Sequence, residues 1–132
     1  MKSLIVEDDF TCRLLLQKLL EPFGVCHAAA DGEEALQAFE SSRAERGPYD
    51  LICLDIMMPG MDGHEVLHRI RETETQSLRM GLHSSKVVMV TALNDKSNVF
   101  SAFREQCDGY LTKPIQKQKL IQLLTDLQLF NF

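Results

Sequence analysis

Five polar residues of this sequence stand directly after short apolar runs, and their chemical types belong together. Glu7 and Asp8 follow one run, Asp55 follows a second, Thr91 a third and Lys113 a fourth. Carboxylates that crowd together repel one another, and at least one pKa rises unless a cation intervenes. A hard divalent ion with oxygen ligands, Mg²⁺ above all, relieves that repulsion. These residue types therefore predict a metal site, provided that the fold brings the four runs together.

The same residues indicate chemistry on phosphorus. A carboxylate that binds a metal ion through one oxygen keeps a second oxygen that can attack an electrophile, and Asp55 is placed for this role. The Thr91 hydroxyl and the Lys113 ammonium would then hold the other phosphoryl oxygens and stabilise their charge. The predicted chemistry is the capture of a phosphoryl group on a carboxylate.

Short apolar runs alternate with helical patterns along the whole chain. The predicted strands share β-branched or continuous apolar character and cover residues 4–6, 25–29, 51–54, 87–90 and 109–111. The predicted helices share apolar residues at helical spacing and cover residues 10–20, 33–46, 64–72, 97–106 and 117–127. Strict alternation predicts an α/β fold, with a doubly wound parallel sheet covered by helices on both faces. Ligands bind such sheets at the carboxyl ends of the strands, where the five polar residues fall.

The composition indicates a single globular domain. The chain has 132 residues, of which 45% are apolar and 25% charged, and its formal net charge is -5. A negative charge without any basic run disfavours a nucleic-acid partner. No apolar stretch approaches the roughly 18 residues of a membrane span, and the N-terminus becomes acidic too early for a signal peptide. With four scattered cysteines, which indicate reduced thiols, we expect a cytoplasmic protein without a membrane or nucleic-acid partner.

The motifs around these positions resemble the receiver domain of two-component response regulators. They occur in the family's order: LIVEDD at 4–9, LDIMMPGMDG at 54–63, VTA at 90–92 and YLTKP at 110–114. The resemblance implies a flavodoxin-like sheet of five strands in the order 2-1-3-4-5 and a cis peptide between Lys113 and Pro114. It also implies one stand-alone receiver domain over residues 1–132, without an output domain.

The resemblance implies a role for each acidic residue. Asp55 is the expected phosphoacceptor and also a ligand of Mg²⁺, with Mn²⁺ as an alternative ion. Asp8 is expected to bind the ion directly, Glu7 through water, and Met57 through its backbone carbonyl. The acidic pair is Glu-Asp rather than the commoner Asp-Asp, and we expect the next residue, Asp9, to cap the following helix.

Switching roles and partners follow from the same resemblance. Thr91 and Lys113 are expected to bind the phosphoryl oxygens, and Tyr110 to turn inward as Thr91 moves. The donor would be a phosphohistidine on a sensor histidine kinase or a phosphotransfer protein. The chain would then catalyse only its own phosphorylation and dephosphorylation, and so would not be an enzyme with a separate substrate.

Two apolar residues beside the expected site predict a long-lived phosphoryl group. Met57 lies two positions after Asp55, and Leu93 lies two positions after Thr91. Fast-hydrolysing members of the family often have polar residues there. Bulky apolar side chains would shield the phosphorus from water and offer it no hydrogen bond.

Output is expected to pass through noncovalent contact, because only residues 128–132 follow the last predicted helix. The expected surface is built by the predicted helix at 97–106, the last strand and the last helix. Its candidate residues are Phe100, Phe103, Tyr110 and Leu120. The downstream target is not identified, and we expect a monomer or weak dimer that acts as a terminal regulator or a relay intermediate.

Three other classes of protein share some of these features. A phosphatase of the haloacid-dehalogenase type also uses an aspartate after a strand, but it would need a second acid where Met57 stands. A flavodoxin-type nucleotide or flavin module would need a phosphate-binding loop where the acidic pair stands. The His64-Glu65-Val66-Leu67-His68 segment matches the pattern of a zinc protease, but the metzincin extension is interrupted by Arg71 and Glu74.

Overall fold

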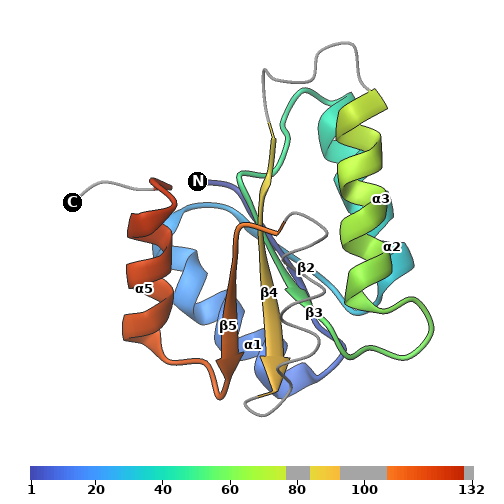
Figure 1. The fold of residues 1–132 in the computed structure, drawn as a ribbon. Helices are drawn as coiled ribbons and strands as arrows, with labels where there is room; N and C mark the ends of the chain where they lie inside the picture. The colour runs from blue at the N-terminus through green and yellow to red at the C-terminus, as the bar shows by residue number, and fades with distance from the viewer. Residues whose placement is uncertain (77–83, 93–106, 130–132) are drawn as a thin grey trace.

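The computed structural model describes residues 1–76, 84–92 and 107–129. These residues form one parallel sheet of five strands in the order β2-β1-β3-β4-β5, which confirms the predicted sheet and strand order (Figure 1). The strands are β1 (Ser3–Val6), β2 (Cys26–Ala29), β3 (Leu51–Asp55), β4 (Lys86–Ala92) and β5 (Gly109–Lys113). Each lies within two residues of its predicted bounds.

Helices cover both faces of the sheet. They are α1 (Phe10–Leu20), the short 3₁₀ helix η1 (Glu21–Phe23), α2 (Gly32–Ala44), α3 (Gly63–Gln76) and α5 (Lys117–Asp126). Figure 1 shows α1 and α5 on one side of the sheet and α2 and α3 on the other. The helix predicted at 97–106 lies outside the described residues.

The alternation of side chains along the strands produces two separate cores. In β1, Leu4 and Val6 pack with α2 and α3, whereas Ile5 between them packs with α1 and α5. Successive residues of a strand point to opposite faces, so a fully apolar strand supplies both cores. The five residues of β3 are all buried, as this position in the middle of the sheet requires.

Helix α1 has the predicted bounds and buries only part of its leucines. Leu16 and Leu20 are fully buried, whereas Leu14 and Leu15 remain 40% exposed. Five leucines between positions 14 and 20 surround the helix, so their spacing alone does not select the side that meets the sheet. The contact with the sheet decides it.

Of the helices that begin at the carboxyl ends of the strands, α1, α2 and α3 are each capped by an aspartate. Asp9 accepts a hydrogen bond from the Cys12 amide at 2.9 Å, as the sequence predicted for Asp9. Asp31 accepts one from the Glu34 amide at 2.8 Å. Asp62 caps α3 in the same way. The caps define where each strand-to-helix turn ends, and they add negative charge at the carboxyl ends of the strands.

Candidate functional site

Parallel pairing brings the ends of four strands to one edge of the sheet. Val6 pairs with Leu54, Asp55 with Val90, and Ala92 with Lys113. The residues that follow β1, that end β3 and that end β5 are therefore neighbours in space. We call this side the carboxyl edge. The prediction that the separate polar residues converge is confirmed for the carboxylates and the lysine.

Three carboxylates form the centre of the site. Glu7, Asp8 and Asp55 each contribute an oxygen, and these three oxygens lie within 4.8 Å of one another. Glu7 is 1% exposed and Asp55 is 3% exposed, whereas Asp8 lies open to solvent. Two acids are thus buried side by side, with the third at the entrance.

One lysine compensates part of this charge. The Lys113 Nζ lies 2.8 Å from Glu7 Oε1 and 3.6 Å from Asp55 Oδ2. Its shorter contact is therefore with Glu7, the residue whose extra methylene lets it reach further than an aspartate. Lys113 precedes a cis peptide to Pro114, as the resemblance implied.

Further donors orient the two buried acids. The Met57 amide donates to Asp55 Oδ1 at 3.2 Å, and the Asp9 amide donates to Glu7 Oε2 at 3.4 Å. The Cys12 thiol is hydrogen-bonded to Glu7, and burial together with this carboxylate raises the pKa of Cys12 to about 12. Cys12 therefore stays a protonated donor. The scattered positions of the cysteines in the sequence do not reveal this contact.

The two buried acids have opposite pKa shifts. Burial raises the pKa of Asp55, and the hydrogen bond and charge of Glu7 raise it further against the opposing effect of Lys113. Burial also acts to raise the pKa of Glu7, but hydrogen bonds from Asp55, Lys113 and Cys12 outweigh it and lower that pKa. The pair therefore holds a proton on Asp55 well above the usual range for a carboxyl group.

The donor set suits a hard divalent cation. All three side chains offer carboxylate oxygens, the ligands that Mg²⁺ prefers. Three carboxylates face one ammonium, so a cation would offset the burial and the nearby Glu7 charge that raise the pKa of Asp55. The Met57 amide donates to Asp55 Oδ1, so the Met57 backbone lies at the same edge.

Thr91 and Tyr110 occupy neighbouring strands near the site. Thr91 is 1% exposed, and its hydroxyl donates to the Ala92 carbonyl at 3.4 Å. Tyr110 pairs with Met89 in the sheet, and its side chain is 44% exposed. The switching roles of both residues stay predictions. Leu93, the other residue expected beside the phosphorus, lies outside the described residues.

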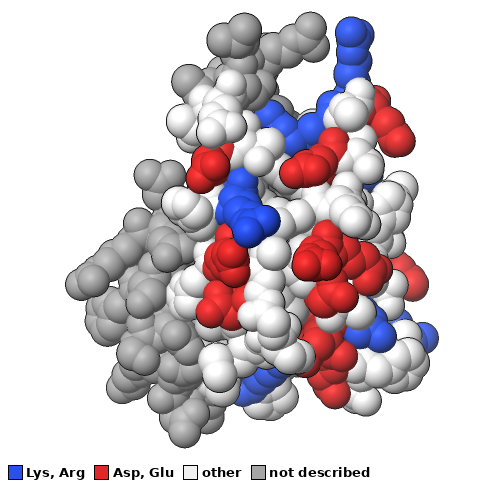
Figure 2. All heavy atoms as spheres, turned by 90° about the vertical axis from the view of Figure 1, so that its right-hand side faces the viewer, with Lys and Arg blue, Asp and Glu red and all other residues white. Residues whose placement is uncertain are grey.

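Exposed acids surround the site. Figure 2 shows large acidic groups over the middle and lower part of the face formed by α2 and α3. The lower part is the end to which the strands point in Figure 1. The exposed acids of the strand-to-helix turns are Asp8, Asp9, Asp31 and Asp62. The carboxyl edge is therefore negative on its surface as well as at its centre.

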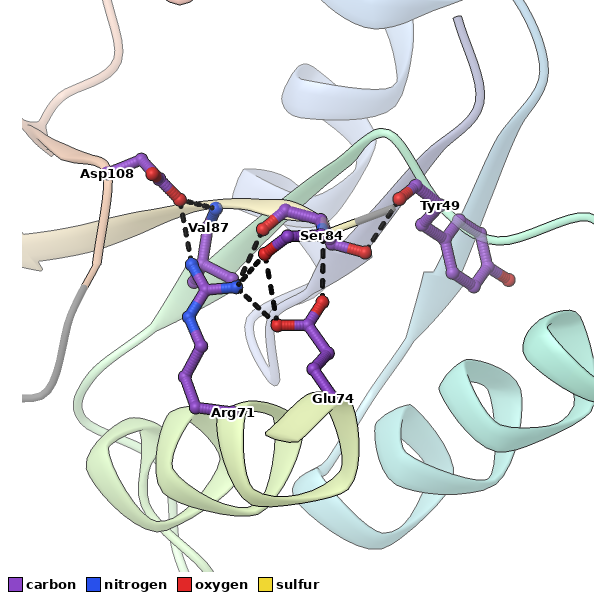
Figure 3. A network of polar contacts seen from close by, with 7 residues as sticks. Tyr49, Arg71, Glu74, Ser84, Val87 and Asp108 are labelled. Atoms are coloured by element: carbon purple, nitrogen blue, oxygen red, sulfur yellow. Dashed lines mark hydrogen bonds and ion pairs between the residues drawn. The ribbon is translucent and has the colours of Figure 1, made fainter. Parts of the chain in front are cut away.

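A second polar cluster lies at the opposite end of the sheet, which we call the amino edge (Figure 3). The Arg71 guanidinium lies 2.7 Å from Glu74 Oε1 and 2.8 Å from Asp108 Oδ2. The same Asp108 oxygen accepts a hydrogen bond from the Val87 amide at 2.8 Å. Arg71 and Glu74 belong to α3, so this helix is tied to the start of β4 and to the turn before β5.

Two serines extend the amino-edge cluster toward the middle of the sheet. The Ser85 amide donates to Glu74 Oε2 at 2.8 Å, and the Ser85 hydroxyl donates to the Tyr49 carbonyl at 2.6 Å. The Ser84 hydroxyl donates to Glu74 Oε1 at 3.2 Å. The apolar pattern of the sequence does not reveal this cluster, because polar residues carry no apolar periodicity. The pattern Arg-x-x-Glu on the end of a helix was the available signal.

The resemblance to a zinc protease is not supported by the geometry. His68 lies 3.3 Å from Glu72, and both side chains are exposed on α3. Within residues 1–76, 84–92 and 107–129, the one potential metal group consists of Glu7, Asp8 and Asp55. The two histidines of the pattern do not belong to it.

Comparisons with known proteins agree with this site. A family model for the response regulator receiver domain matches residues 3–125. The chemotaxis protein CheY of Halobacterium salinarum is 32% identical over 125 residues, which cover 94% of this chain and 93% of that protein. The receiver domain of NtrX from Brucella abortus has a TM-score of 0.79 at 25% identity and covers 98% of this chain and 99% of that chain.

The chain therefore belongs to the response regulator receiver domain family. Regulatory protein VanRB of Enterococcus faecalis is 34% identical over 119 residues, which are 90% of this chain but 48% of VanRB. Similar matches cover between 10% and 13% of three histidine kinases. The chain thus spans half or less of several of its relatives.

Proposed function

We propose that this receiver domain accepts a phosphoryl group on Asp55 with Mg²⁺ and thereby changes a surface that binds a partner protein. The observation that carries the proposal is the convergence of Glu7, Asp8 and Asp55 with Lys113 at one edge of the sheet. Membership of the receiver family supports the same role. The donor is proposed to be a phosphohistidine on a sensor histidine kinase or phosphotransfer protein.

Transfer requires an ionised Asp55, so this residue first gives up the proton that the buried pair holds. A carboxylate oxygen of Asp55 then attacks phosphorus, the P–N bond to the donor histidine breaks, and its electron pair returns to the imidazole. The Met57 amide holds Asp55 Oδ1 and orients the carboxylate. Lys113 Nζ, 3.6 Å from Oδ2, lies within reach of an oxygen of the incoming group.

The cation has a defined place in this proposal. Asp8 and Asp55 would hold it directly, the Met57 carbonyl would be a further ligand, and Glu7 would act through water. Bound there, Mg²⁺ supplies the positive charge that offsets the carboxylates and the phosphoryl oxygens, and Mn²⁺ would serve as a substitute.

Output would follow from a shift between two populations. Phosphorylation adds a charge of about -1.5 to -2, which would recruit Thr91 and Lys113 and favour an inward Tyr110. Tyr110 lines a cavity of about 410 Å³ between β5 and α5, together with Thr112, Lys119, Gln122 and Asp126. We propose this cavity as part of the output surface. Leu120 is 1% exposed and belongs to the core, whereas Phe100 and Phe103 lie outside the described residues.

The cellular setting is part of the proposal. We infer a cytoplasmic regulator or relay intermediate, a monomer or weak dimer that binds neither nucleic acid nor membranes. It would catalyse only its own phosphorylation and dephosphorylation. Among the described residues, no helix combines the length and apolar character that crossing a membrane requires.

Intact mass after incubation with acetyl phosphate and Mg²⁺ tests the proposed function. We expect a gain of about 80 Da, one phosphoryl group, that needs the divalent ion. Asp55→Asn should abolish the gain, whereas Asp31→Asn should keep it, because asparagine also caps a helix. No gain with acetyl phosphate or with any histidine kinase donor, or an equal gain in Asp55→Asn, would refute the assignment.

The lifetime of the phosphoryl group gives a second test of the same site. We propose that Met57 and Leu93 shield the acyl phosphate from water. Replacing both with polar residues should therefore accelerate the loss of the phosphoryl group, measured as the loss of about 80 Da from the intact mass. Rapid loss from the unmodified protein, unchanged by these substitutions, would contradict the shielding role.

A further inference from the structure

Helix α3 begins directly against the backbone of the expected phosphoacceptor. Its first residue, Gly63, is buried, and the Gly63 amide donates to the Ile56 carbonyl at 3.0 Å. A Cβ at Gly63 would stand 2.7 Å from the Ile56 Cα and 3.0 Å from the Asp55 carbonyl carbon, and it would be closer still to the Asp55 carbonyl oxygen. Each of these atoms belongs to the backbone.

The backbone on the other side of this contact has little room to move. β3 lies between β1 and β4 in the sheet, and the Ile56 amide donates to the Val90 carbonyl at 3.1 Å. A side chain at position 63 would therefore shift either α3 or the end of β3. Because the Asp55 carboxylate is held by the Met57 amide at 3.2 Å, a shift at this point changes the position of the acceptor oxygens.

We propose that Gly63 is a positioning residue for phosphoryl transfer: the absence of a side chain seats α3 on the Asp55 backbone and sets where the acceptor carboxylate stands. The inference rests on the proposed function of Asp55. It assigns to Gly63 a role that a glycine beginning a helix does not have by itself.

A second glycine restricts the same loop from its other side. A Cβ at Gly32, the first residue of α2, would lie 2.9 Å from Val66 Cγ2 and 3.0 Å from Met61 Cβ. The loop over residues 56–62 is therefore packed closely at both ends. Val66 Cγ2 can move by rotation of its side chain, whereas Met61 Cβ moves only with the backbone of the loop. Neither atom belongs to β3, so Gly32→Ala should disturb Asp55 less than Gly63→Ala.

Gly60 offers a matched control within this loop. Its φ is +77°, so alanine there is strained, but a Cβ would meet no atom within 4 Å. Gly60→Ala therefore tests the cost of backbone strain without any push on β3.

The experiment compares rates of phosphorylation by acetyl phosphate at saturating Mg²⁺, each divided by the folded fraction measured by circular dichroism. Because small displacements of reacting groups have large kinetic effects, we expect Gly63→Ala to lose about tenfold or more in rate. Gly32→Ala should lose less, and Gly60→Ala should stay within about twofold of the wild type. The loss in Gly63→Ala should persist at every Mg²⁺ concentration, since it concerns the acceptor itself.

Each alternative result has a clear meaning. An unchanged rate in Gly63→Ala, or an equal loss in Gly60→Ala, would overturn the role of Gly63. If Gly63→Ala does not fold in buffer, all variants are compared in trimethylamine N-oxide, which favours the folded state. A Gly63→Ala variant that is still unfolded in trimethylamine N-oxide would also overturn the assignment, because the substitution would then destabilise the whole fold. Absence of phosphorylation of the wild type by acetyl phosphate and by every histidine kinase donor would instead refute the proposed function.

Discussion

The two edges of the sheet treat buried charge in opposite ways. At the carboxyl edge, Glu7, Asp8 and Asp55 share one ammonium, that of Lys113. At the amino edge, the Arg71 guanidinium lies between two carboxylates, and the backbone amides of Ser85 and Val87 donate to the same carboxylates. Both edges have more carboxylates than paired cations, but the excess is larger at the carboxyl edge.

This difference separates stability from function within one small sheet. Burial and Glu7 raise the pKa of Asp55, so this carboxyl group favours its protonated form when no cation is bound. A bound cation would favour the ionised form instead. At the amino edge, both carboxylates are paired with Arg71 and accept hydrogen bonds from backbone amides, so these polar groups stabilise the fold. Functional sites of proteins are commonly destabilising, and interactions elsewhere in the fold compensate for them.

The largest expected effect lies at the amino edge. Arg71→Ala should lower the free energy of unfolding by about 3–5 kcal/mol, because it leaves Glu74 buried without its cation. Urea unfolding measures the change. Arg69→Ala is the matched control, since its pair with Glu65 is exposed, and it should cost about 0.5 kcal/mol or less. Similar losses in both variants would show that the amino edge contributes no special stability.

At the carboxyl edge, we expect a substitution to raise the free energy of unfolding rather than to lower it. Asp55→Asn should raise the free energy of unfolding at pH 7 without Mg²⁺, by about 1 kcal/mol or more, since one unit of pKa shift corresponds to about 1.4 kcal/mol. Added Mg²⁺ should then stabilise the wild type more than the variant. A variant less stable than the wild type in the absence of the ion would refute the idea of an excess of charge.

The pH dependence of this effect follows from the raised pKa of Asp55. A folded-state pKa above the unfolded one means that the folded wild type binds the extra proton, so its relative stability falls as pH rises from the ordinary carboxyl range to about 8. The advantage of Asp55→Asn should therefore grow over that window and vanish below pH 4, where both states are protonated. Thermal unfolding at several pH values checks this, and a constant difference would contradict it.

The smallest expected effect concerns the thiol beside Glu7. Cys12→Ala removes a donor to the buried carboxylate and should cost about 0.5–1.5 kcal/mol, whereas Cys12→Ser keeps a donor and should recover part of the loss. Urea unfolding in Mg²⁺-free buffer measures both. Equal losses in the two variants would mean that packing, rather than the hydrogen bond, explains the role of Cys12.

The sequence predicted those parts of the structure that depend on local pattern. The apolar runs are short and separate, so the strands and their order followed from them, and Asp9 stood where a helix cap belongs. The carboxyl edge could be predicted because parallel strands bring their ends together whatever the details of packing.

The parts that were missed depend on contacts between distant segments. No periodicity reveals that Leu16 rather than Leu14 faces the sheet, or that Lys113 lies nearer to Glu7 than to Asp55. Helix α3 ends at Gln76 and not at 72. Its last turn is stabilised by polar contacts from Glu74 to β4, which an apolar pattern does not contain.

Helix α3 is attached at both of its ends, which limits the directions in which the molecule can respond. Gly63 seats one end on β3, and the Arg71 cluster ties the other end to β4. Among the described residues, β5 and α5 instead border an open cavity, with a partly exposed tyrosine beside it. We therefore expect a response to displace β5 and α5 more easily than α3.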